Sequence, residues 1–98
     1  MATLRIEHAI HDYDIWQQAF DSFQQARERA GVRRFAIRQP VNDPKYLTLD
    51  LEFDTQEEAE SFADFLHCRV WSSATSSPAL AGHPQTSILQ MRRAEECN

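Results

Sequence analysis

The sequence predicts an α+β domain in which four strands form one antiparallel sheet and two helices cover one of its faces. Four segments alternate apolar and polar residues, as strands with one buried face do: 4–10, 32–39, 46–53 and 86–92. Two others repeat apolar residues every three or four positions, as amphipathic helices do: 14–30 and 55–70. With right-handed crossovers, this βαββαβ order gives the ferredoxin-like plait.

The length of the chain limits it to one domain, which we expect to span residues 1–93 and to be followed by a mobile polar tail, 94–98. No stretch approaches the roughly 18 apolar residues of a membrane span. The N-terminus runs directly into a strand pattern without a secretory signal, and Cys68 and Cys97 form neither a CxxC pair nor a disulfide framework. The expected location is the cytoplasm, without membrane association.

The first strand and helix meet in the segment IEHAIHDYDIWQQAF, residues 6–20. His8 shares the inward parity of Leu4 and Ile6 in the strand. Asp12 and Asp14 precede the first helical turn, where carboxylates accept hydrogen bonds from free backbone N–H groups. An apolar stripe then runs along one helix until Gly31: Trp16, Ala19, Phe20, Phe23, Ala26 and Ala30.

The next two strands are predicted to form a hairpin through the turn residues at 40–44. Thr55 and Glu58 have the spacing of a capping box at the start of the second helix. Residues 72–84 are expected to be an irregular connection, with one short helical turn around 78–81, before the last strand.

One face of the predicted sheet is uncovered and charged. It carries Arg5, Glu7, Arg34, Arg38, Tyr46, Thr48, Asp50 and Glu52, and the last strand adds either Thr86, Ile88 and Gln90 or Ser87, Leu89 and Met91. Opposite charges on neighbouring strands predict cross-strand ion pairs that a second copy of the chain covers. The alternative is that Arg34 and Arg38 bind an anionic or phenolic group of a ligand.

Three segments carry a resemblance to a known superfamily: LRIEHAIHDYDIWQQAFD, AGVRRF and YLTLDLEFDTQEEAESF. The chain resembles the dimeric α+β barrel proteins, which include antibiotic biosynthesis monooxygenases, polyketide cyclases and haem-degrading monooxygenases. The resemblance implies a homodimer that pairs the open sheet faces, and a small cavity between the sheet and the helices of each subunit. It also implies chemistry on polycyclic phenols without a metal or flavin, so no cofactor is expected.

The haem-degrading members of that superfamily suggest a minor alternative. They use an Asn on the first strand, a Trp on the second helix and a His just after it, and the corresponding positions here are Glu7, Trp71 and His83. Glu7 replaces the amide that would donate a hydrogen bond near the iron, so the site would be electrostatically different.

Two histidines are candidates for proton transfer. His8 is either a hydrogen-bonded imidazole at the edge of the core or an acid/base in a pocket. His67 lies on a helical stripe with Asp64 and Trp71, which is either an ordinary polar flank or a pocket rim in which Asp64 orients His67. Glu7 is the corresponding partner of His8, and Trp16 and Trp71 would bind the substrate.

Other site classes are disfavoured by the sequence. It contains no CxxC, HExxH or HxH motif that would predict a metal site, and no glycine-rich phosphate loop. A net charge of −5 and the carboxylates Asp50 and Glu52 argue against RNA binding, although RNA-recognition motifs share the βαββαβ order. Two hypotheses remain: a cofactor-independent monooxygenase or cyclase-type enzyme acting on a small hydrophobic or aromatic metabolite, and a dimeric ligand-binding or accessory module without chemistry.

Overall fold

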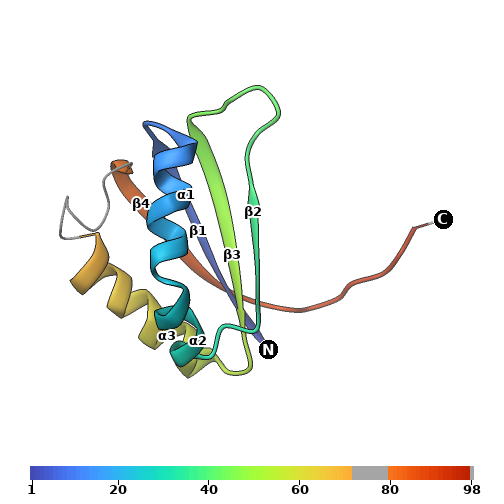
Figure 1. The fold of residues 1–98 in the computed structure, drawn as a ribbon. Coiled ribbons are helices and arrows are strands. Elements are labelled where there is room, and N and C mark those ends of the chain that lie inside the picture. The colour runs from blue at the N-terminus through green and yellow to red at the C-terminus, as the bar shows by residue number, and fades with distance from the viewer. Residues whose placement is uncertain (72–79, 98) are drawn as a thin grey trace.

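A computed structural model describes residues 1–71 and 80–97, without the side chains of Leu80 and His83. Its elements in chain order are β1 (Ala2–Ile10), α1 (Tyr13–Ser22), α2 (Gln24–Ala30), β2 (Arg34–Arg38), β3 (Tyr46–Phe53), α3 (Gln56–Phe65), the π-helical turn η1 (Leu66–Val70) and β4 (Leu80–Gln90). The helices lie on one side of a four-stranded antiparallel sheet, and the chain beyond β4 leads away from it (Figure 1). The predicted α+β class and ferredoxin-like arrangement are confirmed.

β1 is a central strand, because the strand order is β2-β3-β1-β4. Leu4 and Ile6 lie opposite Leu51 and Leu49 of β3, and these four side chains are buried under the helices. Every second residue of β1 is buried and the residues between are partly exposed. The alternation read from the sequence therefore separates a core face from an open face.

β4 begins earlier than predicted and settles which of its residues face outward. Leu80 and Ala81 belong to the strand, which corrects the helical turn predicted for them; the rest of that predicted turn, 78–79, lies outside the described residues. Ser87 pairs with Arg5 and Leu89 with Thr3, which places Ser87 and Leu89 on the open face. The pairing jumps from Gln85 to Ala81, so residues 82–84 form a bulge opposite His8.

The first predicted helix is divided in two, which corrects the single helix expected over 14–30. Asp12 caps α1 as predicted, accepting from the Ile15 amide at 3.1 Å. The Ser22 hydroxyl then donates to the Ala19 carbonyl, and the Arg27 guanidinium donates to the Phe20 carbonyl. Because an uninterrupted helix would use those two carbonyls for its next turn, this competition accounts for the break at Phe23.

The helix predicted over 55–70, which is α3 followed by η1, also departs from a regular α-helix. Its capping box is present as predicted: the Thr55 hydroxyl accepts from the Glu58 amide, and the Glu58 carboxylate accepts from the Thr55 amide, both at 3.2 Å. After Phe65 the backbone changes to a π-helical turn, in which the Trp71 amide donates to the Leu66 carbonyl at 2.8 Å.

Within residues 1–71 and 80–97, no helix is long and apolar enough to cross a membrane.

Gly31, the left-handed residue that ends α2, provides a test of the packing between α2 and α3. Gly31 has φ +94°, and a Cβ there would lie 2.3 Å from the Glu58 carboxylate. Gly31→Ala should cost about 2–3 kcal/mol of unfolding free energy, because it adds backbone strain and displaces a capping-box side chain. Gly82→Ala is the matched control, since Gly82 has φ +86° and open space around its Cβ position. Equal losses in urea denaturation for the two variants would show that the contact with Glu58 does not matter.

Candidate functional site

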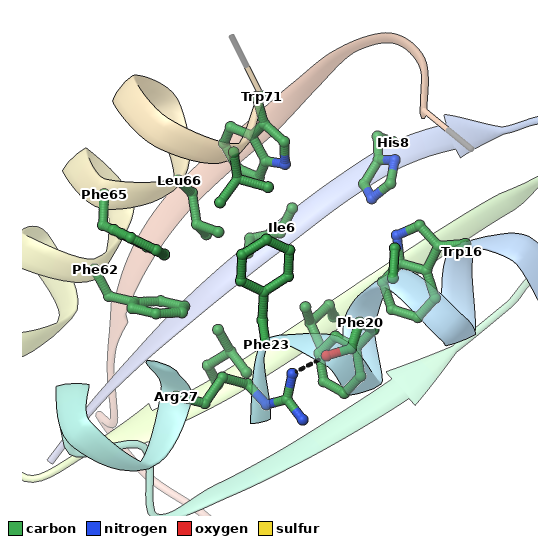
Figure 2. Close-up of a pocket in the computed structure, with 14 residues that line it drawn as sticks. Ile6, His8, Trp16, Phe20, Phe23, Arg27, Phe62, Phe65, Leu66 and Trp71 are labelled. Atoms are coloured by element: carbon green, nitrogen blue, oxygen red, sulfur yellow. Dashed lines mark hydrogen bonds between the residues drawn. The ribbon is translucent and has the colours of Figure 1, made fainter. Parts of the chain in front are cut away.

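A cavity of about 80 Å³ lies between the sheet and the helices. Its floor is formed by side chains of β1 and β3, and its walls by α1, Phe23 and α2 on one side and by α3, η1 and Trp71 on the other (Figure 2). Among the residues that the structure describes, only two polar or charged side chains are buried, His8 and Arg27. Both line this cavity, whose other walls are apolar and largely aromatic.

His8 is held in one protonation form by its surroundings. Its side chain is only 4% exposed, and Nδ1 lies 3.1 Å from the Ala9 carbonyl oxygen. Because a carbonyl can only accept, Nδ1 carries the proton and Nε2 has a free lone pair. Burial lowers the pKa of the imidazole, so His8 is neutral at pH 7. Figure 2 shows its ring pointing into the space between Trp71 and Trp16.

The wall on the α1 side is a stack of aromatic rings. Trp16 stacks on Phe20 with a centroid distance of 5.1 Å, and its ring centroid lies 6.2 Å from that of His8. Phe20 in turn meets the edge of Phe35 on β2 at 5.0 Å. Such a wall offers flat apolar surfaces against which an aromatic ligand can lie.

The opposite wall depends on the π-helical turn. Leu66 and Trp71 are five residues apart, and in a regular α-helix their side chains would point about 140° apart. The π-helical turn between them reduces this separation, and both side chains line the cavity and pack against the core. Trp71 therefore leaves the polar stripe to which the sequence assigned it, whereas Asp64 and His67 remain exposed.

Arg27 is a cavity residue that sequence reasoning missed. Its guanidinium carbon lies 3.6 Å from the centre of the Phe20 ring, and the side chain is 7% exposed. Burial lowers its pKa, but an arginine remains cationic at neutral pH. The signal was present, because Trp16, Phe20, Phe23 and Arg27 follow one another at offsets of four, three and four residues, which place Arg27 on the apolar stripe.

The structure brings together three of the predicted site residues: His8, Trp16 and Trp71. Asp64 and His67 lie outside the cavity, and no hydrogen bond joins them among the described interactions; the His67 ring meets the edge of Trp71 at 4.8 Å. Glu7 lies on the other face of β1, where its carboxylate accepts from the Tyr46 hydroxyl at 3.3 Å. Glu7 is therefore not placed to orient the His8 ring.

The remaining predicted site residues, Arg34 and Arg38, lie on the open face in cross-strand ion pairs. Arg34 is 3.4 Å from Glu52, and Arg38 is 3.1 Å from Asp50. Asp50 also accepts two hydrogen bonds of 2.8 Å from Arg5, and these bonds lower the pKa of the carboxyl group. The arginines of this face thus already have carboxylate partners.

The described residues do not assemble the positions that a haem site would use. Glu7 faces away from the cavity that Trp71 lines, and the side chain of His83 lies outside the description. In the same part of the chain, no three His, Cys, Asp or Glu side chains are grouped so that they could hold a metal ion.

Comparison with solved structures identifies the same fold in oxygenases. SnoaB from Streptomyces nogalater, described as a cofactor-independent oxygenase, has a TM-score of 0.72 and 14% identity over 95% of this chain and 94% of its own. A monooxygenase, ActVA-Orf6 of Streptomyces coelicolor, solved with the ligand nanaomycin D, has a TM-score of 0.68 and 12% identity over 99% and 92%. A candidate antibiotic biosynthesis monooxygenase from Nitrosomonas europaea has a TM-score of 0.67 and 18% identity over 93% and 98%.

These likenesses confirm the fold that the resemblance implied, that of the antibiotic biosynthesis monooxygenases. No protein-family model matches the sequence, and no curated protein matches it either.

The buried, neutral His8 should make the protein sensitive to mild acid. Because burial lowers its pKa in the folded state, the unfolded chain takes up the proton first as the pH falls below about 6.5. The resulting loss of unfolding free energy is at most about 1.4 kcal/mol per pH unit, and it stops once the folded pKa is passed. His8→Gln should remove this part of the acid sensitivity, measured by urea denaturation at several pH values. Exposed His11→Gln is the control, and an unchanged pH dependence in His8→Gln would show that His8 is not a buried neutral imidazole.

Proposed function

We propose that the protein is a cofactor-independent enzyme of the monooxygenase or cyclase type, and that it acts on a small hydrophobic or aromatic metabolite bound in the cavity. The observation that carries this proposal is His8, a neutral imidazole whose free lone pair lies in an aromatic-lined cavity. The oxygenases that share the fold support the reaction class. Location in the cytoplasm remains a prediction from the sequence.

In this proposal His8 acts as the general base. Nε2 accepts a proton from a phenolic hydroxyl or from an acidic carbon next to a carbonyl, and the Nδ1 hydrogen bond to Ala9 keeps the ring oriented. The product is an electron-rich phenolate or enolate. Such an anion reacts with dioxygen in an oxygenase, or with a carbonyl carbon of the same molecule in a cyclase.

The size of the cavity constrains how a substrate binds. An engineered cavity of about 150 Å³ holds benzene, whereas the volume here is about 80 Å³. A ligand with one or more aromatic rings therefore has to displace part of the wall. The second candidate function is a dimeric ligand-binding or accessory module without chemistry, and a cavity this small favours its accessory form, because side chains already fill most of the site.

A turnover assay separates the two functions. Wild-type protein would be incubated with 1-naphthol and with dithranol, an anthrone, while oxygen uptake and product absorbance are followed. We expect oxygen-dependent turnover that falls about 100-fold or more in His8→Ala, because positioned proton transfer contributes about 10²–10⁴-fold. His67→Ala tests the other candidate base and should retain activity, and exposed His11→Ala is the control.

The outcomes of this assay are distinct. Binding of the probes without turnover would replace the enzyme with the binding module. Turnover that His8→Ala leaves intact would remove His8 from the mechanism, and loss in His67→Ala alone would assign the base to the exposed histidine.

We also propose that two copies of the chain pair through the open sheet face. No described residues form a layer over this face in the single chain, and its three arginines are ion-paired across β2, β3 and β1 with two carboxylates: Arg5 and Arg38 with Asp50, and Arg34 with Glu52. Leu89 adds an apolar side chain that is 41% exposed. Paired charges are the form in which ionic groups are tolerated in a covered interface, which for a stable dimer should bury more than about 1,000 Å².

Sedimentation equilibrium at micromolar concentration tests this pairing. We expect a species of twice 11.4 kDa for the wild type. Asp50→Lys should yield the single chain, because it removes the partner of Arg5 and Arg38 and adds a third cation beside them. Glu60→Lys makes the same charge change on the exposed side of α3 and should leave the dimer intact. A wild-type protein that sediments at 11.4 kDa would contradict the proposal.

A further inference from the structure

Arg27 is the one charged side chain that is buried in the described part of the chain. Each of the five ion pairs found there involves another arginine, and no carboxylate lies within 4.0 Å of the Arg27 guanidinium. Asp21 and Glu28 act on it only as more distant charges. A buried cation without a nearby counter-charge is costly, so its presence here needs a reason.

Part of that reason is structural. One guanidinium N–H donates to the Phe20 carbonyl, which belongs to the last turn of α1, and the last turn of that helix has no basic residue of its own. The guanidinium carbon also lies over the Phe20 ring, and it is 5.4 Å from the centre of the Phe35 ring. These contacts position the side chain and stiffen it.

They leave most of its hydrogen-bonding capacity unused. A guanidinium has five N–H donors, and the Phe20 carbonyl is the only acceptor that the described residues provide. No fully buried side-chain nitrogen or oxygen in this part of the chain lacks a partner. The two guanidinium nitrogens without a partner, Nε and Nη2, therefore keep some accessible surface, and Arg27 lines the cavity.

We propose that Arg27 binds an oxyanion of the ligand, so that the site takes aromatic molecules that carry a negative charge. This inference rests on the proposed function in that the ligand occupies the same cavity as the substrate. With His8 neutral, Arg27 gives the cavity a single positive charge inside a protein of net charge −5. The anion would be a carboxylate or an acidic ring oxygen, because either accepts from the fork of two N–H groups that a guanidinium presents.

The arrangement gives the two buried polar residues different tasks. Arg27, on α2, would hold an oxygen that is already negative, and His8, on β1, would receive a proton from a second group of the same ligand. A neutral base beside a cation-anchored ligand also avoids placing two positive charges in the cavity before the reaction.

The experiment compares matched probes by quenching of tryptophan fluorescence, since Trp16 and Trp71 both line the cavity. 1-Naphthoate and 1-naphthalenecarboxamide have the same ring and differ in charge, and 1-naphthol, ionised at high pH, tests a ring oxygen in place of a carboxylate. Charge-assisted hydrogen bonds predict that naphthoate binds about 10- to 100-fold more tightly than the carboxamide. Arg27→Met should abolish this preference and leave carboxamide binding within a few-fold of wild type.

Two further variants separate anion binding from a purely structural role. Arg29→Met removes a charge from the exposed side of the same helix and should keep the preference. Arg27→Lys retains the positive charge but not the pair of N–H groups of a guanidinium, and it should retain part of the preference for naphthoate. Should Arg27→Met fail to fold, as judged by circular dichroism, the preference of the wild type alone still tests the proposal.

Equal binding of naphthoate and the carboxamide by the wild type would overturn the proposal, as would a preference that survives in Arg27→Met or no binding of either probe. An anion preference without turnover on any phenol would instead refute the enzymatic function and leave Arg27 as the anion site. Turnover of phenols without an anion preference would refute the anion site at Arg27 and leave the enzymatic function.

Discussion

The two-residue alternation of β1 is the constraint on which the rest of the molecule depends. This strand is hydrogen-bonded to β3 on one side and to β4 on the other, so its side chains can only point up or down. One parity supplies Leu4, Ile6 and His8 to the space under the helices, and the other supplies Arg5 and Glu7 to the open face. A shift of one residue would exchange the two environments, and leucines of β3 set against Leu4 and Ile6 prevent it.

The two faces of the sheet differ in how their charged and polar side chains are neutralised. On the open face, carboxylates and arginines of neighbouring strands satisfy one another, and water reaches most of them. Under the helices, the described part of the chain has two buried polar groups, and neither has an ionic partner there: His8 is kept neutral by burial, and Arg27 is held by a carbonyl and an aromatic ring. A cavity of this kind favours an aromatic ligand that brings its own charge and its own acidic proton.

In the described part of the chain, irregular backbone lies at three places around this cavity. The break at Phe23 follows the competition of Ser22 and Arg27 for helix carbonyls, the π-helical turn brings Trp71 to the wall, and the bulge at 82–84 lies opposite His8. Each irregularity sits where a regular element would have directed its side chains or backbone differently. Such local departures from regular geometry are common at functional sites.

The sequence by itself determined the order of strands and helical crossovers, the core parity of β1 and β3, the caps at Asp12 and Thr55, and the charged open face. These follow from local periodicity and from side chains bonding to backbone a few residues away, which a linear pattern records. The cavity was decided by tertiary structure, because its members come from six elements. An apolar stripe does not show whether an arginine within it will be without a carboxylate partner, and a helical repeat assumes α-helical geometry where η1 is π-helical. The outward parity of β4 was likewise open until pairing with β1 fixed it, because both of its faces alternate equally well in the sequence.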